Sequence, residues 1–191
     1  KVGLNQLVIY LGLNSSALLG LVTLIATTVV IVFIFFGQLL SRSGGTQFFS
    51  DISLATMGGF RGGSAKIAIF ASSLFGSVSG VAIANIVATG VVTIPLMKKG
   101  GYSARMAAAI EAVASTGGQL MPPVMGAVAF LMADFLELPY REIVIAALGP
   151  SILYYVSLFI QADLEAARDG IKAVEKNLVS SPGTVMRKGW Q

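Results

Sequence analysis

The stretch "STGGQLMPP", residues 115–123, decides how this chain folds. It places two glycines and two prolines inside a segment, residues 106–136, that is otherwise apolar enough for the interior of a membrane. Proline lacks the N–H that a helix uses and clashes with the carbonyl one turn earlier, whereas glycine lets the backbone leave helical dihedral angles. We therefore predict an interrupted helix, with two half-helices that meet near the middle of the membrane.

The composition around this stretch is typical of an integral membrane protein. The 191 residues have a mean hydropathy of +0.82 and 12% charged residues, against about 25% in ordinary soluble domains. His and Cys are absent, which excludes imidazole or thiolate catalysis, disulfides and Cys/His zinc sites within this chain. The net charge of +4 comes without basic residues clustered among stacking aromatics, so we expect no nucleic-acid partner.

The fold class that follows is an all-α polytopic membrane protein. The sequence begins "KVGLNQ", with neither an initiator Met nor a recognisable signal peptide, and it ends in the polar stretch "MRKGWQ". We expect a fragment of a longer polytopic protein.

Two segments have the composition of simple spanning helices, which need roughly 20 predominantly apolar residues. Residues 17–40 carry no charge and are followed by Ser-Arg-Ser-Gly-Gly, a helix stop with a basic residue at the interface. Residues 143–160 form the second apolar segment. We assign residues 1–43 to an N-terminal segment with its spanning helix, and residues 139–162 to the later spanning helix.

The segment 44–64 is too short and too polar to span a membrane. Phe48, Phe49, Ile52 and Ala55 recur at helical spacing, which favours an amphipathic helix that lies in the membrane interface. An ordinary connecting helix packed on the protein fits the same pattern equally well.

The segment 65–100 is predicted to be a re-entrant helical hairpin. Its central 31 residues, 67–97, carry no charge, which is long for one span and short for two. Basic residues flank both ends, so the positive-inside rule places both ends on the cytoplasmic face. The small, hydroxylic sequence "GSVSG" at 76–80 suits a tight turn, with the tip near Ser79 and Gly80.

The charge distribution completes the topology. Residues 101–138 form the interrupted helix, and the short loop "ELPYRE" after it is assigned to the outer face of the membrane. Residues 163–191 form a cytoplasmic polar tail. Ten of the thirteen basic residues fall in loops or tails assigned to the inside, Lys66 falls at the base of the hairpin, and only Lys1 and Arg141 fall outside. This asymmetry supports the orientation.

The interruptions indicate what the membrane segments do. Irregular backbone at membrane depth persists only where it is buried in protein or lines a cavity. The two prolines should free carbonyls around residues 118 and 119. Carbonyls and hydroxyls suit Na⁺, and half-helix N-termini suit an anionic substrate, a combination used by secondary transporters. The alternative is a simple kink that aids packing.

Two polar residues inside apolar segments have open roles. A carboxylate within a spanning segment is rare and is a functional hypothesis by default. Glu111 could carry a proton, ligate a cation, or pair structurally with Arg105 or a backbone donor. Asn85 could bond one arm of the hairpin to the other or contact substrate.

The stretch "GSVSGVAIANIVATGVVTIPLMKKGGYSARMAAAIEAVASTGGQLMPPVMGAVAFLMADFLELPY" resembles the large membrane subunit of TRAP transporters, the tripartite ATP-independent periplasmic carriers. "RGGSAKIAIFASSLFGSVSG" and "PSILYYVSLFIQADLEAA" resemble most the fused permeases, in which the small and large membrane subunits form one polypeptide. The resemblance covers residues 19–167 or so. It implies Na⁺-driven uptake of organic anions such as carboxylates, delivered by a periplasmic solute-binding protein.

The resemblance also implies an elevator-type fold with two inverted repeats, of which this chain corresponds to one. The remaining half of the permease and a small membrane subunit would be its partners, in the cytoplasmic (inner) membrane of a bacterium or archaeon. No cofactor is implied apart from Na⁺ as the coupling ion, and no enzymatic activity is expected.

The resemblance extends to individual positions. The candidate substrate contacts are Ser79, Asn85 and Gln119. Independently of the resemblance, Glu111 is the candidate proton carrier or structural carboxylate because it lies inside an apolar segment. Family members often read Ser-Gly-Ser-Ala at the tip, whereas Val81 removes one hydroxyl here. The candidate sodium ligands are Ser77, Ser79, Gly80, Thr116, Gly117, Gly118 and Pro122.

Two other functions fit parts of the sequence. Another elevator-type sodium/anion symporter would share the hairpin and the interrupted helix but would need no binding protein. An intramembrane enzyme would use Ser77, Ser79 or Glu111 as catalytic groups, but the chain offers no plausible base beside either serine.

Overall fold

The computed structural model describes residues 2–14, 17, 20–174 and 182–189, and this part of the chain contains helices and no strand. The all-α prediction is confirmed. Three described helices are long and apolar enough to cross a membrane: Val22–Arg42, Ala82–Lys99 and Tyr140–Arg168. Lys1 and Lys176, two of the basic residues used for the topology, lie outside the described residues.

The first candidate span is one continuous helical rod. It consists of α2 (Leu21–Ile25), a π-helical turn (Ala26–Val30) and α3 (Ile31–Arg42). The hydroxyl of Thr28 donates to the carbonyl of Leu24 at 2.6 Å within this turn. Such bonds satisfy backbone acceptors that an irregular turn would otherwise expose in an apolar setting. The rod is preceded by α1 (Leu4–Leu13).

Helix α4 (Gly45–Met57) packs on the protein along a face of small residues. Its buried residues are Ser50 and Ser53, whose hydroxyls donate to carbonyls of their own helix. Small side chains let helices approach closely. The apolar stripe that suggested an interfacial helix is half-buried. These contacts favour the connecting helix over the interfacial one.

Helices α5 (Gly63–Ser79) and α6 (Ala82–Lys99) form the predicted helix pair. They are joined by Gly80, with φ of +63°, and Val81, which is extended. The Asn85 side chain donates from Nδ2 to the carbonyl of Ser72 at 2.8 Å and so ties the two arms together. The re-entrant position of this hairpin in a membrane stays a prediction.

The interruption predicted from the opening stretch is present. Helix α7 (Ala104–Gly117) ends at the first glycine, and α8 (Ala127–Phe135) begins after an irregular connection that contains both prolines. Long helix α9 (Tyr140–Arg168) follows. It extends six residues past the boundary we drew at 162, because Asp163 and Ala166 pack against the protein rather than belonging to a solvated tail. The last described helix is α10 (Pro182–Gly189).

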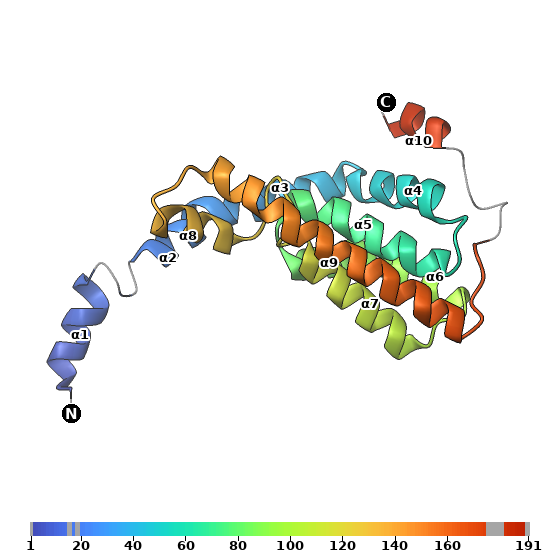
Figure 1. The fold of residues 1–191 in the computed structure, drawn as a ribbon. Coiled ribbons are helices and arrows are strands. Elements are labelled where there is room, and N and C mark those ends of the chain that lie inside the picture. Colours follow the sequence, from blue (N-terminus) through green and yellow to red (C-terminus); the bar gives the residue numbers. More distant parts are fainter. Residues whose placement is uncertain (1, 15–16, 18–19, 175–181, 190–191) are drawn as a thin grey trace.

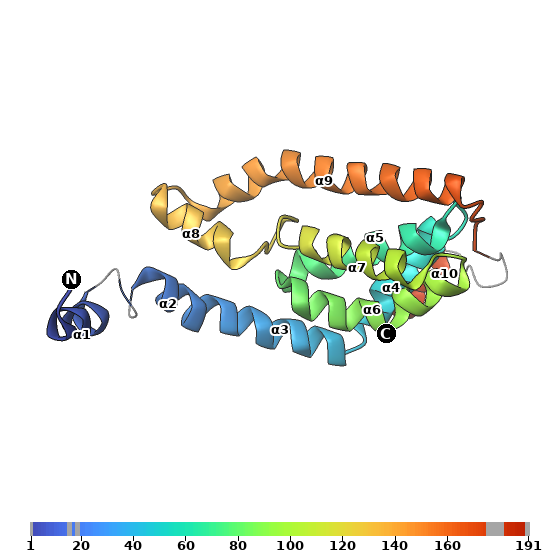
Figure 2. The same ribbon diagram turned by 90° about the horizontal axis from the view of Figure 1, so that it is seen from below.

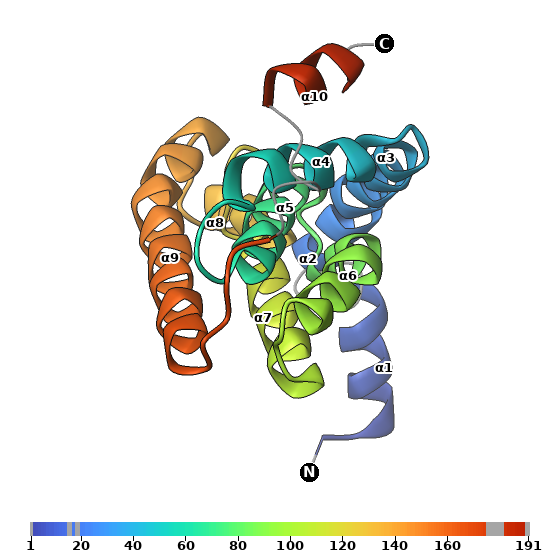
Figure 3. The ribbon, with the colours of Figure 1, turned by 90° about the vertical axis from the view of Figure 1, so that its right-hand side faces the viewer.

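Helix α5 is the centre of the fold. It packs against α3, α4, α6, α7 and α9, and 12 of its 17 residues are buried. Figure 1 shows α9 running across the front of the helix bundle. Figure 2 shows α9 along one side of the molecule and the α2–α3 rod along the opposite side, with α5, α6 and α7 between them. Figure 3, turned by 90°, shows α5 surrounded by its neighbours.

The interruption lies beside the middle of α9. The hydroxyl of Tyr154 donates to the carbonyl of Val113, near the end of α7. Tyr154 has 14 residues of α9 on either side of it, from 140 to 154 and from 154 to 168. In Figure 2, α7 and α8 follow one another along the length of α9. The break therefore occurs halfway along a helix long enough to span a membrane.

Candidate functional site at the hairpin tip and the interrupted helix

The hairpin and the interrupted helix meet through their glycines. A Cβ built on Gly76 would lie 2.5 Å from the Cα of Gly118, so neither position has room for a side chain. At the next residue of α5, the carbonyl of Ser77 accepts from the N–H of Val124 at 3.1 Å. Gly80 packs directly against the carbonyl of Met125. The two interruptions predicted separately from the sequence therefore form one junction.

The carbonyls at residues 118 and 119 are not left free in this structure. The carbonyl of Gly118 accepts from the N–H of Met121 at 3.3 Å, and that of Gln119 accepts from the N–H of Gly126 at 2.8 Å. The connection satisfies them by turning back on itself, which the helix rule alone does not reveal. A carbonyl oxygen has two lone pairs, so each keeps one site for a further contact.

Ser79 provides an unpaired hydroxyl at the junction. Its side chain is 2% exposed, and its Oγ has no hydrogen-bond partner among the described residues. It lies at the C-terminal end of α5, where a Cβ built on Gly37 of α3 would lie 3.5 Å from the Cβ of Ser79. A buried hydroxyl without a partner costs free energy. Among the predicted site residues of the junction, this atom is therefore the one most in need of a further ligand.

The other predicted hydroxyls bond within their own helices. Ser77 donates to the carbonyl of Leu74, and Thr116 donates to the carbonyl of Ala112, both at 2.8 Å. Thr116 is exposed, and Ser77 is half-buried. Each oxygen retains lone pairs that could face a cation.

The remaining predicted residues have different surroundings. Asn85 is fully buried between the hairpin arms, where the interarm bond described above is one of the two roles left open. Gln119 is exposed at the interruption. Gly117 is buried against the rings of Tyr154 and Tyr155. Pro122 is half-buried in the connection, and the structure gives it no polar contact of its own.

Aromatic residues hold the far side of the interruption in place. The hydroxyl of Tyr140 donates to the carbonyls of Pro123 and Val124. Its ring stacks on Phe130 of α8 with centroids 4.4 Å apart and planes at 3°. Tyr155 likewise donates to the carbonyl of Ala114 at 3.1 Å. Side chains of α9 thus satisfy carbonyls on both sides of the break.

Glu111 lies apart from this junction, in a buried cluster of hydroxyls. Its carboxylate contacts Ser72 of α5, Thr89 and Thr93 of α6, and Ser115 of its own helix, at 2.5–3.2 Å. Arg105, the ion-pair partner considered from the sequence, is exposed and makes no such contact.

The sequence prediction did not include these four hydroxyls. A signal was available, because Asn85, Thr89 and Thr93 recur every four residues along α6 and so share one face of an otherwise apolar helix. Ser115 follows Glu111 at the same spacing. The opening stretch drew attention to Thr116, but the buried hydroxyl at the end of α7 is that of Ser115.

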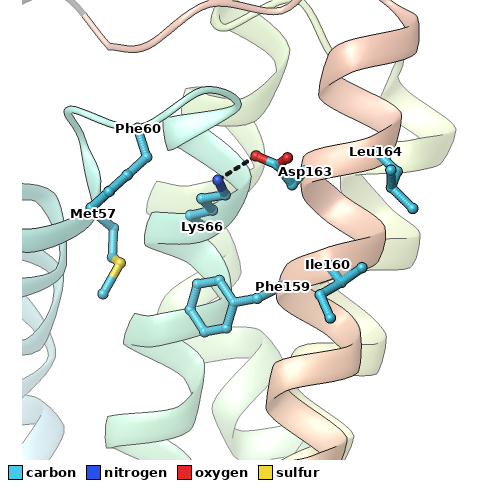
Figure 4. Close-up of a pocket in the computed structure, with 7 residues that line it drawn as sticks. All are labelled: Met57, Phe60, Lys66, Phe159, Ile160, Asp163 and Leu164. Carbon is cyan, nitrogen blue, oxygen red and sulfur yellow. Dashed lines mark hydrogen bonds and ion pairs between the residues drawn. The ribbon is translucent and has the colours of Figure 1, made fainter.

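A groove of about 360 Å³ lies at the opposite end of the hairpin, between α5 and α9 (Figure 4). Its polar end is the ion pair between Lys66 and Asp163 at 2.6 Å, and Asp163 also pairs with Arg61. The hydrogen bond from Arg61 to Asp163, together with the negative charge of Asp163, raises the pKa of Arg61. Its apolar lining is Met57, Phe60, Phe159, Ile160 and Leu164.

The same carboxylate acts on a neighbouring tyrosine. Burial, followed by the charges of Asp163, Asp169 and Glu165, raises the pKa of Tyr102 to about 12. The phenol therefore keeps its proton, which it donates to the carbonyl of Ala162 at 3.3 Å. The base of the hairpin is thus attached to α9 by ionic and hydrogen-bonded contacts.

Comparison with known proteins gives a consistent family. Residues 7–191 match the family model described as "Tripartite ATP-independent periplasmic transporter, DctM component". The chain is 30% identical over 140 residues to the ectoine/5-hydroxyectoine TRAP transporter large permease protein UehC of Ruegeria pomeroyi, which covers 73% of this chain and 32% of that protein. It is 29% identical over 135 residues to the C4-dicarboxylate TRAP transporter large permease protein DctM of Vibrio cholerae. This match covers 70% of this chain and 30% of that protein.

A more distant relative is the 2,3-diketo-L-gulonate TRAP transporter large permease protein YiaN of Escherichia coli, which is 21% identical over 144 residues. This match covers 75% of this chain and 33% of that protein. The chain thus spans about a third of the length of the curated relatives it matches. The family model nevertheless covers nearly all of the chain, and its helices are those of a membrane protein. The chain belongs to the DctM family, the large permease component of tripartite ATP-independent periplasmic transporters.

Proposed function

We propose that this chain is part of a permease that imports organic anions in symport with Na⁺, after a periplasmic solute-binding protein has delivered them. The observation that carries the proposal is the junction of hairpin tip and interrupted helix beside the middle of α9. Backbone that is irregular at membrane depth is characteristic of the binding sites of secondary transporters.

Helix ends of both polarities converge on this junction. Helices α5 and α7 end there, at Ser79 and Gly117, while α6 and α8 begin there, at Ala82 and Ala127. Helix C-termini carry partial negative charge and favour cations, whereas N-termini carry partial positive charge and favour anions. The arrangement supports a site that takes a sodium ion and an anionic group side by side.

The oxygen atoms at the junction fit a hard cation. The unpaired hydroxyl of Ser79 supplies one ligand, and the Ser77 hydroxyl and the backbone of Gly80 are close in the chain. From the interrupted helix, the hydroxyl of Thr116 and the carbonyls at 117, 118 and 122 complete the proposed set. Hydroxyl and carbonyl oxygens of this kind are the ligands that hard cations prefer.

The proposed substrate class is that of organic anions, carboxylates above all. Two of the relatives named above transport solutes that their names give as C4-dicarboxylate and 2,3-diketo-L-gulonate. Gln119 is the exposed candidate contact at the junction. Ser79 and Asn85 are buried, and they would contact a substrate only when the hairpin tip moves.

The proposal includes partners that lie beyond this chain. A second inverted repeat and a small membrane subunit would complete the permease in the cytoplasmic membrane of a bacterium or archaeon. The hairpin and interrupted helix would then move together as an elevator against the rest of the molecule. The chain alone should not transport.

The experiment is uptake by the complete permease in proteoliposomes, with labelled carboxylates and the cognate binding protein. We expect uptake only with an inward Na⁺ gradient and the binding protein present. Uptake that ignores Na⁺ and follows a pH gradient would overturn the sodium assignment. Na⁺-driven uptake of free substrate, without the binding protein, would instead support an elevator-type symporter of another kind.

A further inference from the structure

The most unusual polar group in the molecule is the carboxylate of Glu111. It is 0% exposed, in the middle of the contact between the hairpin and α7. Its Oε1 lies 2.5 Å from Thr89 Oγ1, 3.1 Å from Ser72 Oγ and 3.2 Å from Ser115 Oγ, and its Oε2 lies 2.5 Å from Thr93 Oγ1. Four hydroxyls from three helices therefore surround one carboxylate.

No cation balances this group within the part of the chain that the structure describes. It is the only acidic residue of α5, α6 and α7. Burying an ionised carboxylate without an opposite charge is costly. Four hydroxyl donors offset part of that cost. The titratable groups on α4, α5, α6, α7 and α9 are exposed or have other partners; they are Asp51, Lys66, Lys98, Lys99, Arg105, Tyr140, Arg141, Glu142, Tyr154, Tyr155, Asp163, Glu165 and Arg168.

The two threonines can reverse their hydrogen bonds. Besides facing Glu111, Thr89 Oγ1 lies 2.8 Å from the carbonyl of Asn85, and Thr93 Oγ1 lies 3.0 Å from the carbonyl of Thr89. A hydroxyl has one proton to donate and can also accept. When the carboxylate is ionised, the threonines donate to it. When it is protonated, it donates to one threonine, which turns its own proton to the carbonyl one turn back.

The spacing favours a proton over a metal ion at this position. A hard cation such as Ca²⁺ keeps each oxygen ligand at about 2.3–2.6 Å, so separate ligands around it stand roughly 3 Å or more apart. Both threonine oxygens lie 2.5 Å from the carboxylate oxygens. These separations are those of hydrogen bonds between hydroxyl and carboxylate oxygens, with a proton and not a metal ion between the two atoms.

We infer that Glu111 is a proton-binding site, distinct from the junction at the hairpin tip, that joins the hairpin to α7. The carboxylate has a complete set of hydrogen bonds in either protonation state only while α5, α6 and α7 keep their present packing. Proton binding and the position of the hairpin are therefore thermodynamically linked. Gly90 makes room for the site, since a Cβ there would lie 3.3 Å from Glu111 Cγ.

Infrared difference spectroscopy of the complete permease tests this inference. A pH titration should show the band of a protonated carboxyl group that is lost as the pH rises, and Glu111→Gln should remove that band at every pH. Thr93→Val keeps the shape of the side chain but cannot reverse a hydrogen bond, so it should shift the midpoint of the titration.

Matched controls separate the site from general packing. Ser72→Ala removes a hydroxyl that faces Glu111 and should shift the midpoint. Ser73→Ala removes the neighbouring hydroxyl, which donates to the carbonyl of Phe70, and should leave the midpoint unchanged. Thr56→Val on α4 is the corresponding control for Thr93→Val, since Thr56 bonds only within its own helix.

The inference is overturned if the pH-dependent carboxyl band persists in Glu111→Gln, or if no such band appears over the pH range in which the protein stays folded. Equal midpoints for Ser72→Ala, Thr93→Val and the wild type would also overturn it. The titration requires neither Na⁺ nor transport. Its failure is therefore distinguishable from failure of the sodium-coupled uptake proposed above.

Discussion

Gly76 of the hairpin and Gly118 of the interrupted helix bring their backbones into direct contact. A Cβ on Gly76 would lie 2.5 Å from the Cα of Gly118, and a Cβ on Gly118 would lie 2.6 Å from the Cα of Gly76. Small residues at a crossing let membrane helices approach this closely. The contact joins the two interruptions into one junction, and the function we propose depends on it.

Adding a methyl group at this crossing should separate the two elements. For Gly76→Ala and Gly118→Ala we expect a loss of stability of about 1–3 kcal/mol, the usual cost of overpacking, and weaker Na⁺-dependent uptake. Thermal unfolding in detergent and uptake assays measure the two effects. Gly149→Ala in α9 is the control, because nothing lies within 4 Å of a Cβ there. It should stabilise the helix by up to about 1 kcal/mol.

Removing the unpaired hydroxyl of Ser79 should weaken Na⁺ binding without lowering the stability of the fold. Because Ser79 Oγ has no partner among the described residues, Ser79→Ala should leave stability without Na⁺ unchanged or slightly higher. It should also raise the Na⁺ concentration needed for half-maximal stabilisation. Ser64, whose buried hydroxyl is likewise unpaired, lies at the start of α5, away from the junction. Ser64→Ala should therefore keep the wild-type sodium dependence, and equal shifts in both variants would contradict the assignment.

The ion pairs at the base of the hairpin should hold it to α9. Asp163→Asn leaves Lys66 and Arg61 without their carboxylate, so we expect a lower unfolding temperature. Added salt should lower the unfolding temperature of the wild type more than that of the variant, because salt screens the ion pair between Arg61 and Asp163. Glu165→Gln is the control, because its pair with Arg168 is 3.9 Å long and largely exposed on the arginine side. An identical loss in both variants would argue against a specific tie at Asp163.

The space beside Glu111 should be sensitive to a single methyl group. Gly90→Ala places a Cβ 3.3 Å from Glu111 Cγ, which should displace the carboxylate from Thr93. We expect a cost of about 1–3 kcal/mol. In a Glu111→Ala background the same change should cost clearly less, because contacting residues couple in double-mutant cycles. Additive costs in unfolding measurements would show that the two residues do not interact.

Much of this fold follows from local rules applied to the sequence. The break after Gly117 was predictable because two glycines followed by two prolines within seven residues strongly disfavour a continuous helix. The hairpin turn at Gly80 was predictable because an uncharged segment of that length with basic flanks has to return to the same face. The first prediction depends on the conformations of neighbouring residues, and the second depends on how a segment of that length and charge pattern fits a membrane.

The hydrogen-bond partners of the backbone carbonyls at the interruption could not be predicted in the same way. The carbonyl of Gln119 accepts from Gly126, and those of Pro123 and Val124 accept from Tyr140, which is distant in sequence. Such partners depend on how helices pack, not on local propensity. The surroundings of Glu111 were missed for the same reason, since its hydroxyl donors come from three helices.

We predict that binding of Na⁺ closes the hairpin tip on the interrupted helix, and this prediction has one direct test. Residues 1–191 contain no Cys. In a complete permease whose remaining part also carries no Cys, Val81→Cys places a single half-buried reporter at the tip. The measurement is the rate at which a thiol reagent labels this residue in Na⁺ and in K⁺ at equal ionic strength. We predict that Na⁺ slows labelling several-fold and that Ser79→Ala abolishes the difference. Equal labelling rates in the two ions would contradict a sodium site at the junction.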